Sequence, residues 1–382
     1  MTSRIPFNRP TIVGRELANI VDAVTRGQLA GDGFYTRACE TRLRDIVGGG
    51  SVFLTHSCTA ALEMAAILLD LGPGDEVVMP SFTFVSTANA VALRGATPVF
   101  VDVDPQTLNI DPERVRTAVT ARTKAIFAVH YAGVPAEMDT LQQIADAHRL
   151  PIVEDAAQAL GSRYRGRPAG SLGRLAAFSF HETKNVISGE GGALVVNDPR
   201  LADRAAIIRE KGTNRTQFFE GRVDKYTWVD IGSSFLPGEL VAAYLYGQIE
   251  LADAINARRR AVWHLYHEAL EELERGALLR RPVVPAHCDH NGHMYYVLLP
   301  TPDARRSFIA AMAKQGIGTP FHYVPLHGSP AGRRLGRVSG PMRVTDDLAA
   351  RLVRLPLFHS LSDDAARDVV SALRSSITGG RP

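Results

Sequence analysis

Short apolar segments alternate with amphipathic segments between about residues 51 and 200. Apolar runs bounded by turn residues are typical of strands in a buried parallel sheet, and amphipathic segments between them are typical of crossover helices. The expected strands are 51–54, 76–79, 97–101, 125–130, 151–154, 176–179 and 192–196. The expected helices are 58–69, 83–94, 112–119, 138–149 and 199–211. The pattern therefore predicts a large α/β unit around a mostly parallel sheet.

The pattern changes after about residue 245. An arginine-bearing amphipathic segment at 249–273 predicts one long helix, and alternation at 293–299 predicts a strand. Residues 212–234 have little periodicity and carry Thr, Asn, Gln, Gly and aromatic residues, which indicates a long functional loop rather than a strand or helix. We expect a large domain over residues 1–245 and a smaller α+β domain over residues 246–382.

Composition excludes several classes of protein. The chain has 382 residues, 45% of them hydrophobic, and a net charge of +3, so it can bury a large core but has no basic stripe for nucleic acid. No apolar run approaches the roughly 20 residues that span a bilayer. The first 14 residues contain no apolar signal segment, so we expect a cytoplasmic protein without membrane attachment. Three widely spaced cysteines, Cys39, Cys58 and Cys288, argue against a disulfide scaffold.

Lysine is rare among the basic residues. Of 43 basic residues, 38 are arginine and five are lysine. The lysines are Lys124, Lys184, Lys211, Lys225 and Lys314. None follows a glycine, which excludes a P-loop, and no G-x-G-x-x-G fingerprint is present for a Rossmann oxidoreductase. Any function that requires a lysine therefore has five candidates.

Polar and aromatic residues follow several predicted strands, where ligands bind in open parallel sheets. Ser57 and Thr59 lie at a strand-to-helix turn, which could seat a phosphate or could be an ordinary helix cap. Phe84 follows the next strand and could stack on a flat ligand or lie in the core. Glu154 and Asp155 end a fully apolar strand, where they would need a cationic partner or would cap the next segment.

The segment that decides between these alternatives surrounds Lys184. A strand ends at Ser179, Lys184 follows five residues later, and the glycine-rich turn at 189–192 leads into another strand. Lysine forms a covalent imine with carbonyl compounds once its pKa is lowered. Pyridoxal 5'-phosphate (PLP) needs such a lysine, an acid at its pyridine nitrogen, a phosphate seat and a stacking aromatic, and all four have candidates at strand ends.

With these motifs the chain resembles the DegT/DnrJ/EryC1/StrS family of nucleotide-sugar aminotransferases, which have the PLP fold-type I architecture. The segment Ser179-Phe180-His181 with Lys184 and the following Gly189-Glu190-Gly191-Gly192 carries most of the resemblance. Segments 130–134, 210–215, 225–234 and 325–328 are most similar to family members that aminate a dTDP-4-keto-6-deoxy sugar. The resemblance implies dTDP-4-keto-6-deoxy-D-glucose as amino acceptor and L-glutamate as donor, which leaves as 2-oxoglutarate.

The resemblance also implies roles for individual residues. Lys184 would hold the cofactor covalently and Asp155 would keep its ring nitrogen protonated. Gln158 would bond the ring hydroxyl and Phe84 would stack on the ring. The phosphate would be held by Cys58, Thr59 and Ser179, and by Ser234 from a partner subunit, where many family members have asparagine. We therefore expect a homodimer with shared active sites.

Four alternatives remain open. His181, His322 and His327 are substrate-contact candidates, but each could be a structural histidine. His287, Cys288, His290 and His293 have metal-ligand spacing, although we expect no metal site there. A PLP-dependent ketosugar dehydratase is disfavoured because such relatives replace the lysine with histidine. A non-catalytic regulator on the same fold is disfavoured because Lys184, Asp155 and Gln158 are all present.

Overall fold

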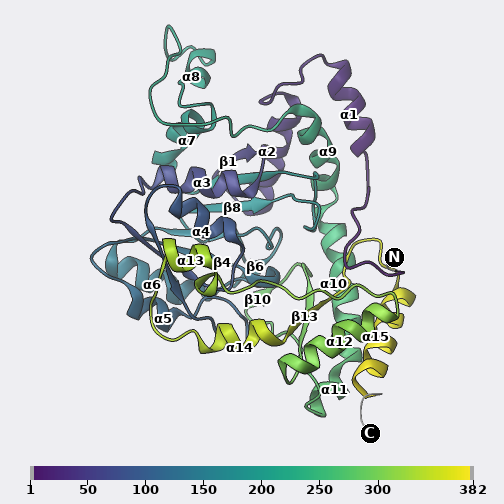
Figure 1. The fold of residues 1–382 in the computed structure, drawn as a ribbon. Coiled ribbons are helices and arrows are strands. Elements are labelled where there is room, and N and C mark those ends of the chain that lie inside the picture. The colour runs from purple at the N-terminus through teal and green to yellow at the C-terminus, as the bar shows by residue number, and fades with distance from the viewer. Residues whose placement is uncertain (1–3, 379–382) are drawn as a thin grey trace.

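An eight-stranded sheet forms the centre of the large part of the molecule (Figure 1). The computed structural model describes residues 4–378. The sheet order is β1-β9-β8-β5-β4-β2-β3-β12. Its strands are β1 (Ser51–Thr55), β2 (Glu76–Pro80), β3 (Thr97–Val101), β4 (Thr123–Val129), β5 (Ile152–Asp155), β8 (Leu175–Ser179), β9 (Gly192–Val196) and β12 (Arg337–Val338). β9 pairs antiparallel with both β1 and β8 and the other pairings are parallel, so the expected mostly parallel mixed sheet is confirmed.

Successive residues of the strands face two different hydrophobic cores. On β4, Ala125 and Phe127 face one core while Ile126 and Ala128 face the other. The first core contains α3 (Cys58–Leu68), α4 (Val85–Ala92) and α7 (Ala202–Arg209). The opposite face is covered by α2 (Phe34–Val47), α5 (Pro112–Ala118), α6 (Met138–His148) and α9 (Glu239–Glu250). This two-sided burial explains the continuous apolar runs in the sequence.

A separate core lies in the C-terminal part of the chain (Figure 1). A two-stranded antiparallel sheet joins β11 (Tyr295–Leu298) and β13 (Leu352–Leu355). Helices around it are α10 (Ala252–Ala269), α11 (Glu271–Arg275), α12 (Pro302–Lys314) and α15 (Asp363–Thr378). The division between residues 245 and 246 falls inside α9 and stays a prediction.

Two expected elements differ from the structure. The long helix expected at 249–273 is divided into α9, α10 and α11, because Leu251 and Leu270 have ψ values of 14° and 2° that no longer continue the α-helix. The loop expected at 212–234 contains a short helix, α8 (Arg215–Phe219), and two isolated bridges, Glu210 with Ser234 and Thr213 with Trp228. Local backbone pairing therefore organises part of a segment that lacks hydrophobic periodicity.

Two strands of the C-terminal part pair with strands of the large part. β12 pairs with β3, and β10 (Cys288–Asp289) pairs with β6 (Arg163–Tyr164), which also pairs with β7 (Arg167–Pro168). Arg337 on β12 also bonds both carboxylate oxygens of Glu76 at 2.9 and 2.6 Å. None of the helices over residues 4–378 is long and apolar enough to cross a membrane.

Candidate active site

A cavity of about 650 Å³ lies at the carboxyl ends of the parallel strands. Segments after β1, β2, β5 and β8 form one wall, and residues 293–294, 320–323 and 354–357 from the C-terminal part form another. The predicted residues that line it are Cys58, Thr59, Phe84, Asp155, Gln158, Ser179, His181, Lys184 and His322. Parallel strands end at the same edge of a sheet, so residues far apart in sequence converge here.

Lys184 lies in a loop that connects β8 to β9 and folds back on itself. Phe180 N–H donates to Gly191 O at 2.8 Å, Glu182 N–H to Gly189 O at 2.9 Å and Lys184 N–H to His181 O at 2.9 Å. Burial lowers the pKa of the Lys184 amine, the charge of Arg354 lowers it further, and Cys58 and Asp155 oppose this shift. A lowered pKa increases the fraction of neutral amine, which is the nucleophilic form.

Asp155 is a buried carboxylate held by two donors. Thr87 Oγ1 donates to Asp155 Oδ2 at 2.7 Å, and Ala157 N–H donates to Asp155 Oδ1 at 3.2 Å. Thr87 in turn shares a 2.9 Å hydrogen bond with Thr83. Thr83 and Thr87 were not among the predicted site residues. Both lie in the segment 83–94 that the sequence predicts as a helix, where a spacing of four places side chains on one face and could have indicated them. The observed helix α4 begins later, at Val85.

The first turn of α3 offers a seat for a phosphate. The Ser57 side chain accepts from Ala60 N–H at 3.1 Å, and Thr59 Oγ1 shares a 2.7 Å hydrogen bond with Ser86 Oγ. Unpaired N–H groups and the helix dipole favour an anion at such a turn. Burial raises the pKa of the Cys58 thiol well above its usual value, so the thiol stays uncharged beside an anion. A Cβ on Gly192 would lie 2.4 Å from Cys58 N, so this close approach requires glycine.

Gln158 has a fixed orientation. Its Oε1 accepts from Ala132 N–H at 2.7 Å and its Nε2 donates to Tyr323 OH at 2.7 Å. Tyr323 was not predicted, because nothing in its local sequence indicates a contact with a residue 165 positions away. Phe84 is 56% exposed, and its ring centroid lies 6.2 Å from that of Tyr323. The Phe84 ring is therefore accessible to a flat ligand.

The three predicted histidines have different surroundings. His322 Nδ1 shares a 2.8 Å hydrogen bond with Tyr131 OH, and burial lowers its pKa well below the usual value. His181 lies at the rim, with Nδ1 2.9 Å from Thr183 Oγ1.

The structure places His327 and Ser234 apart from the lining of this cavity. His327 Nδ1 lies 2.7 Å from Ser81 Oγ and its Nε2 lies 3.3 Å from Asp346. Ser234 is exposed and forms a bridge with Glu210. A contact of His327 with substrate, and of Ser234 with a partner's cofactor, stay predictions.

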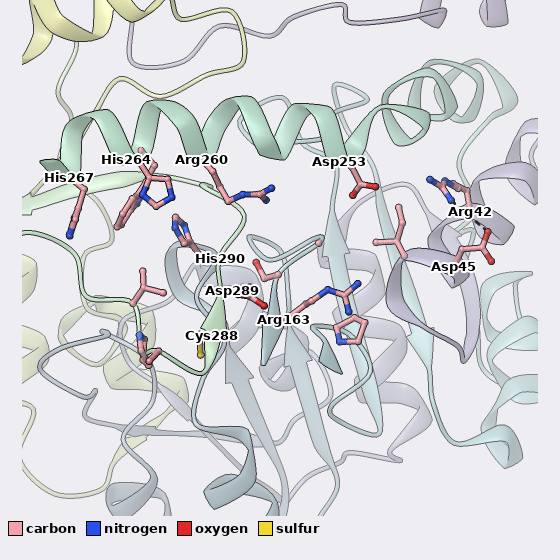
Figure 2. A pocket seen from close by; sticks show the side chains of 18 residues that line it. Arg42, Asp45, Arg163, Asp253, Arg260, His264, His267, Cys288, Asp289 and His290 are labelled. Atoms are coloured by element: carbon pink, nitrogen blue, oxygen red, sulfur yellow. Dashed lines mark ion pairs between the residues drawn. The ribbon is translucent and has the colours of Figure 1, made fainter. Parts of the chain in front are cut away.

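A second, larger cavity of about 870 Å³ lies beside α10 (Figure 2). Figure 2 shows His264, His267 and Arg260 on α10, with His290 and Asp289 below them. The Trp263 ring is covered by His267, with ring centroids 4.5 Å apart, and by His290, with centroids 4.4 Å apart.

The residues with metal-ligand spacing, His287, Cys288, His290 and His293, have different surroundings. His287 Nε2 lies 2.7 Å from Glu137, Cys288 Sγ donates to Pro135 O at 3.8 Å, and His293 Nδ1 lies 3.0 Å from Asn185 Oδ1. Within residues 4–378, no group of three or more His, Cys, Asp or Glu side chains is placed to hold a metal ion. His293 instead lines the cavity that contains Lys184.

The family model of the DegT/DnrJ/EryC1/StrS aminotransferase family matches residues 10–374. The chain belongs to this family. A curated relative, the uncharacterized protein MJ1066 of Methanocaldococcus jannaschii, is 33% identical, with 99% of each chain covered. The family is PLP-dependent, so the chain is a PLP-dependent aminotransferase with the fold-type I architecture.

Solved structures show the same fold over nearly the whole chain. DesV of S. venezuelae, solved in complex with a ketimine intermediate, has a TM-score of 0.89 at 33% identity, with 99% of each chain covered. The putative sugar aminotransferase Spr1654 of Streptococcus pneumoniae, in its pyridoxamine phosphate (PMP) form, has a TM-score of 0.92 at 26% identity, covering 98% of this chain and 100% of that one. The donor set described above fits PLP in charge and chemistry.

Proposed function

We propose that this aminotransferase transfers the amino group of L-glutamate to the C4 ketone of dTDP-4-keto-6-deoxy-D-glucose. The products would be 2-oxoglutarate and a dTDP-4-amino-4,6-dideoxy sugar. The observation that carries this proposal is the enclosure of Lys184 in one cavity with Asp155 and the polar first turn of α3. Membership of the family and the similarity of segments 130–134, 210–215, 225–234 and 325–328 to enzymes that act on this sugar support it.

Cofactor binding would use the wall formed by the strand ends. Cys58, Thr59 and Ser179 would hold the phosphate, Phe84 would stack on the ring, and Gln158 would bond the ring hydroxyl through the Nε2 hydrogen that Tyr323 does not use. Asp155 would keep a proton on the pyridine nitrogen, with its carboxylate oriented by Thr87.

Proton transfer would be performed by Lys184. When bound, PLP withdraws electrons from the carbon that loses its proton. The Lys184 amine would take the proton from Cα of glutamate in the first half-reaction and deliver one to C4 of the sugar in the second. The C-terminal wall, including His322 and Tyr323, would limit access of water to the reacting carbon.

The acceptor would be recognised at the cavity mouth. His181 at the rim and His322 deeper in the cavity offer imidazole groups to sugar hydroxyls or to the diphosphate. His327 forms a hydrogen bond with Ser81 and would reach the acceptor only after a conformational change of the segment 323–328.

A second copy of the chain would complete the site. Exposed aromatic side chains lie in the segment that contains α8 and Ser234, with Phe219 at 68%, Tyr226 at 54% and Trp228 at 79% exposure. Exposed apolar residues gathered in one segment are typical of protein interfaces. In the homodimer, Ser234 would contact the cofactor phosphate of the partner subunit.

The test is product analysis with purified holoenzyme. Incubation with L-glutamate and the keto sugar should yield 2-oxoglutarate and an amino sugar in which an amine replaces the C4 ketone. Both products are detected by mass spectrometry. Proton coupling constants at C4 will distinguish the equatorial (gluco) amine from the axial (galacto) amine. A cofactor that glutamate converts to its amine form, with no amino sugar produced, would overturn the choice of acceptor.

A further inference from the structure

His293 lines the Lys184 cavity from the C-terminal wall, just before β11, and is only 8% exposed. Its backbone carbonyl accepts from Arg259 Nη2 at 2.5 Å, and the carbonyl of Gly292 accepts from Arg259 Nε at 3.1 Å. Arg259 is itself buried, so it holds two successive carbonyl groups in fixed positions. The imidazole of His293 therefore projects from a rigid backbone.

Asn185, which follows Lys184 in sequence, determines which nitrogen of His293 carries the hydrogen. Asn185 Nδ2 donates to Asn256 Oδ1 at 2.8 Å and to the backbone carbonyl of Asn291 at 2.9 Å. A backbone carbonyl can only accept, so the Asn185 amide has one orientation, with its Oδ1 3.0 Å from His293 Nδ1. An amide oxygen has no hydrogen to give, so Nδ1 is the donor in this pair.

The other ring nitrogen of His293 is left as an acceptor. A neutral imidazole carries one hydrogen, so Nε2 has a lone pair and no hydrogen. Burial lowers the pKa of His293 well below its usual value, and the charges of Lys184, Arg259, His322 and Arg354 lower it further, so the ring stays neutral. In the part of the chain that the structure describes, no group donates to Nε2, and this atom remains accessible. A largely buried acceptor without a donor is costly, which indicates that a donor binds there during the reaction.

The Lys184 amine is the donor that fits this acceptor. It lines the same cavity, and of the four charged groups that act on the pKa of His293 it has the largest effect. The two acids of the lining are engaged or distant from the interior, because Asp155 is already held by two donors and the Glu190 side chain is 72% exposed. Among the described residues the Lys184 amine has no hydrogen-bond partner, and its flexible four-carbon stem lets it turn toward Nε2.

We propose that His293 is a positioning residue for Lys184, and that its Nε2 accepts a hydrogen bond from the Lys184 amine whenever that amine is free of the cofactor. This role rests on the proposed function, in which Lys184 carries the proton. A lysine side chain has many rotamers, so a fixed acceptor keeps the amine close to the carbon it serves. A hydrogen bond from an ammonium group is charge-assisted, which makes even a neutral imidazole a strong partner.

Two substitutions separate this role from a purely structural one. In His293→Gln the side-chain oxygen can take the place of Nε2, so an acceptor remains in the cavity. In His293→Asn the shorter amide can still donate to Asn185 Oδ1, as Nδ1 does, but no acceptor reaches the cavity. Asparagine therefore replaces a residue that merely holds Asn185, whereas glutamine replaces the positioning residue proposed here. The control is His148→Asn, at an exposed position in the last turn of α6.

The first measurement needs neither amino donor nor sugar. The full-length apoenzyme of each variant is labelled with trace acetic anhydride over a range of pH, and peptide mass spectrometry compares acetylation of Lys184 with that of the exposed Lys314. An acceptor stabilises the ammonium form and so raises the pKa of Lys184, which means that loss of the acceptor lowers this pKa. The pH of half-maximal labelling of Lys184 should fall by about one unit in His293→Asn, and by less than about 0.3 unit in His293→Gln and His148→Asn.

The second measurement follows removal of the proton in single turnovers of the holoenzyme with L-glutamate, recorded by cofactor absorbance. His293→Asn should react about 10-fold more slowly than the wild type, and His293→Gln should stay within about 3-fold of it. Because a slower proton transfer limits more of the observed rate, the isotope effect of 2-deuterated glutamate should be larger in His293→Asn than in the wild type. A loss of stability alone would not change this isotope effect.

Three results would overturn the role of His293. These are an unchanged labelling profile in His293→Asn, an unchanged isotope effect in that variant, or a loss in His293→Gln that equals or exceeds the loss in His293→Asn. If the wild-type holoenzyme does not react with L-glutamate, the proposed function fails, but the labelling of the apoenzyme still decides whether His293 bonds the Lys184 amine.

Discussion

The two cavities differ in how their side chains are used. The lining of the larger cavity beside α10 balances three arginines with three aspartates: Arg42, Arg163 and Arg260 with Asp45, Asp253 and Asp289. Arg42 lies 4.0 Å from Asp45, and the Trp263 ring is already in contact with two imidazoles. In the smaller cavity, the Lys184 amine and the first turn of α3 retain bonding capacity that residues 4–378 do not use. Volume therefore does not identify the site in this molecule, whereas unused donors and nucleophiles at strand ends do.

The strongest test of this comparison is Lys184→Ala. Without the amine, the proton transfers at Cα and C4 lose their base, so turnover with glutamate and the keto sugar should fall by at least about 10³-fold. Steady-state release of 2-oxoglutarate measures this. Lys314→Ala, at an exposed position in the last turn of α12, is the control and should retain full activity. Normal turnover of Lys184→Ala would remove the smaller cavity as the active site.

A smaller effect is expected for Thr87→Val. The substitution keeps the shape of the side chain but removes the 2.7 Å hydrogen bond to Asp155. We expect kcat/KM to fall about 10-fold and the free energy of unfolding to fall by about 1.5–3 kcal/mol, because a buried carboxylate loses a donor. Thr117→Val on the exposed face of α5, whose hydroxyl bonds only backbone carbonyls, controls for loss of a threonine hydroxyl. Unchanged kinetics would show that Thr87 does not orient Asp155.

The smallest effect concerns the larger cavity and should appear in stability alone. Burial lowers the pKa of His290 from 6.5 to about 4. Between pH 6.5 and 4 the unfolded chain therefore binds a proton that the folded chain does not, and the free energy of unfolding falls as the pH falls.

His290→Asn removes this group while keeping an acceptor near Gly292 N–H, which bonds His290 Nδ1 at 3.2 Å. Urea unfolding at pH 7 and 5.5 should show the wild type losing about 1 kcal/mol more than the variant. The kcat of the variant should stay within about 2-fold of the wild-type value. A change of that size is far smaller than the loss expected when a catalytic group is removed. A larger change in kcat would break the distinction between the two cavities.

Much of the strand-end wall could be predicted from the sequence. Cys58, Phe84, Asp155 and Ser179 each follow an apolar run, and parallel strands necessarily bring their carboxyl ends to one edge. The rarity of lysine then limited the nucleophile to few candidates, of which Lys184 alone follows a strand and precedes a glycine-rich turn.

The C-terminal wall could not be predicted in the same way. Tyr323 and Arg354 reach the cavity through packing of the C-terminal core, and their neighbours in sequence carry no sign of that contact. The direction of the His327 side chain also depends on a distant contact, and its role as a substrate contact stays a prediction. Leu326 N–H donates to Ser81 O at 3.0 Å, which fixes a turn that directs His327 toward Ser81 and Asp346. Such long-range contacts set side-chain direction independently of local sequence.

The short strand β12 has a consequence for how the chain can be divided. With only Arg337 and Val338, it covers the outer edge of β3 in parallel pairing. A fragment ending at residue 245 would leave that edge of β3 without its partner, and exposed strand edges promote pairing with other chains. We therefore expect the N-terminal portion to self-associate when expressed alone, and co-expression with residues 246–382 to suppress that aggregation.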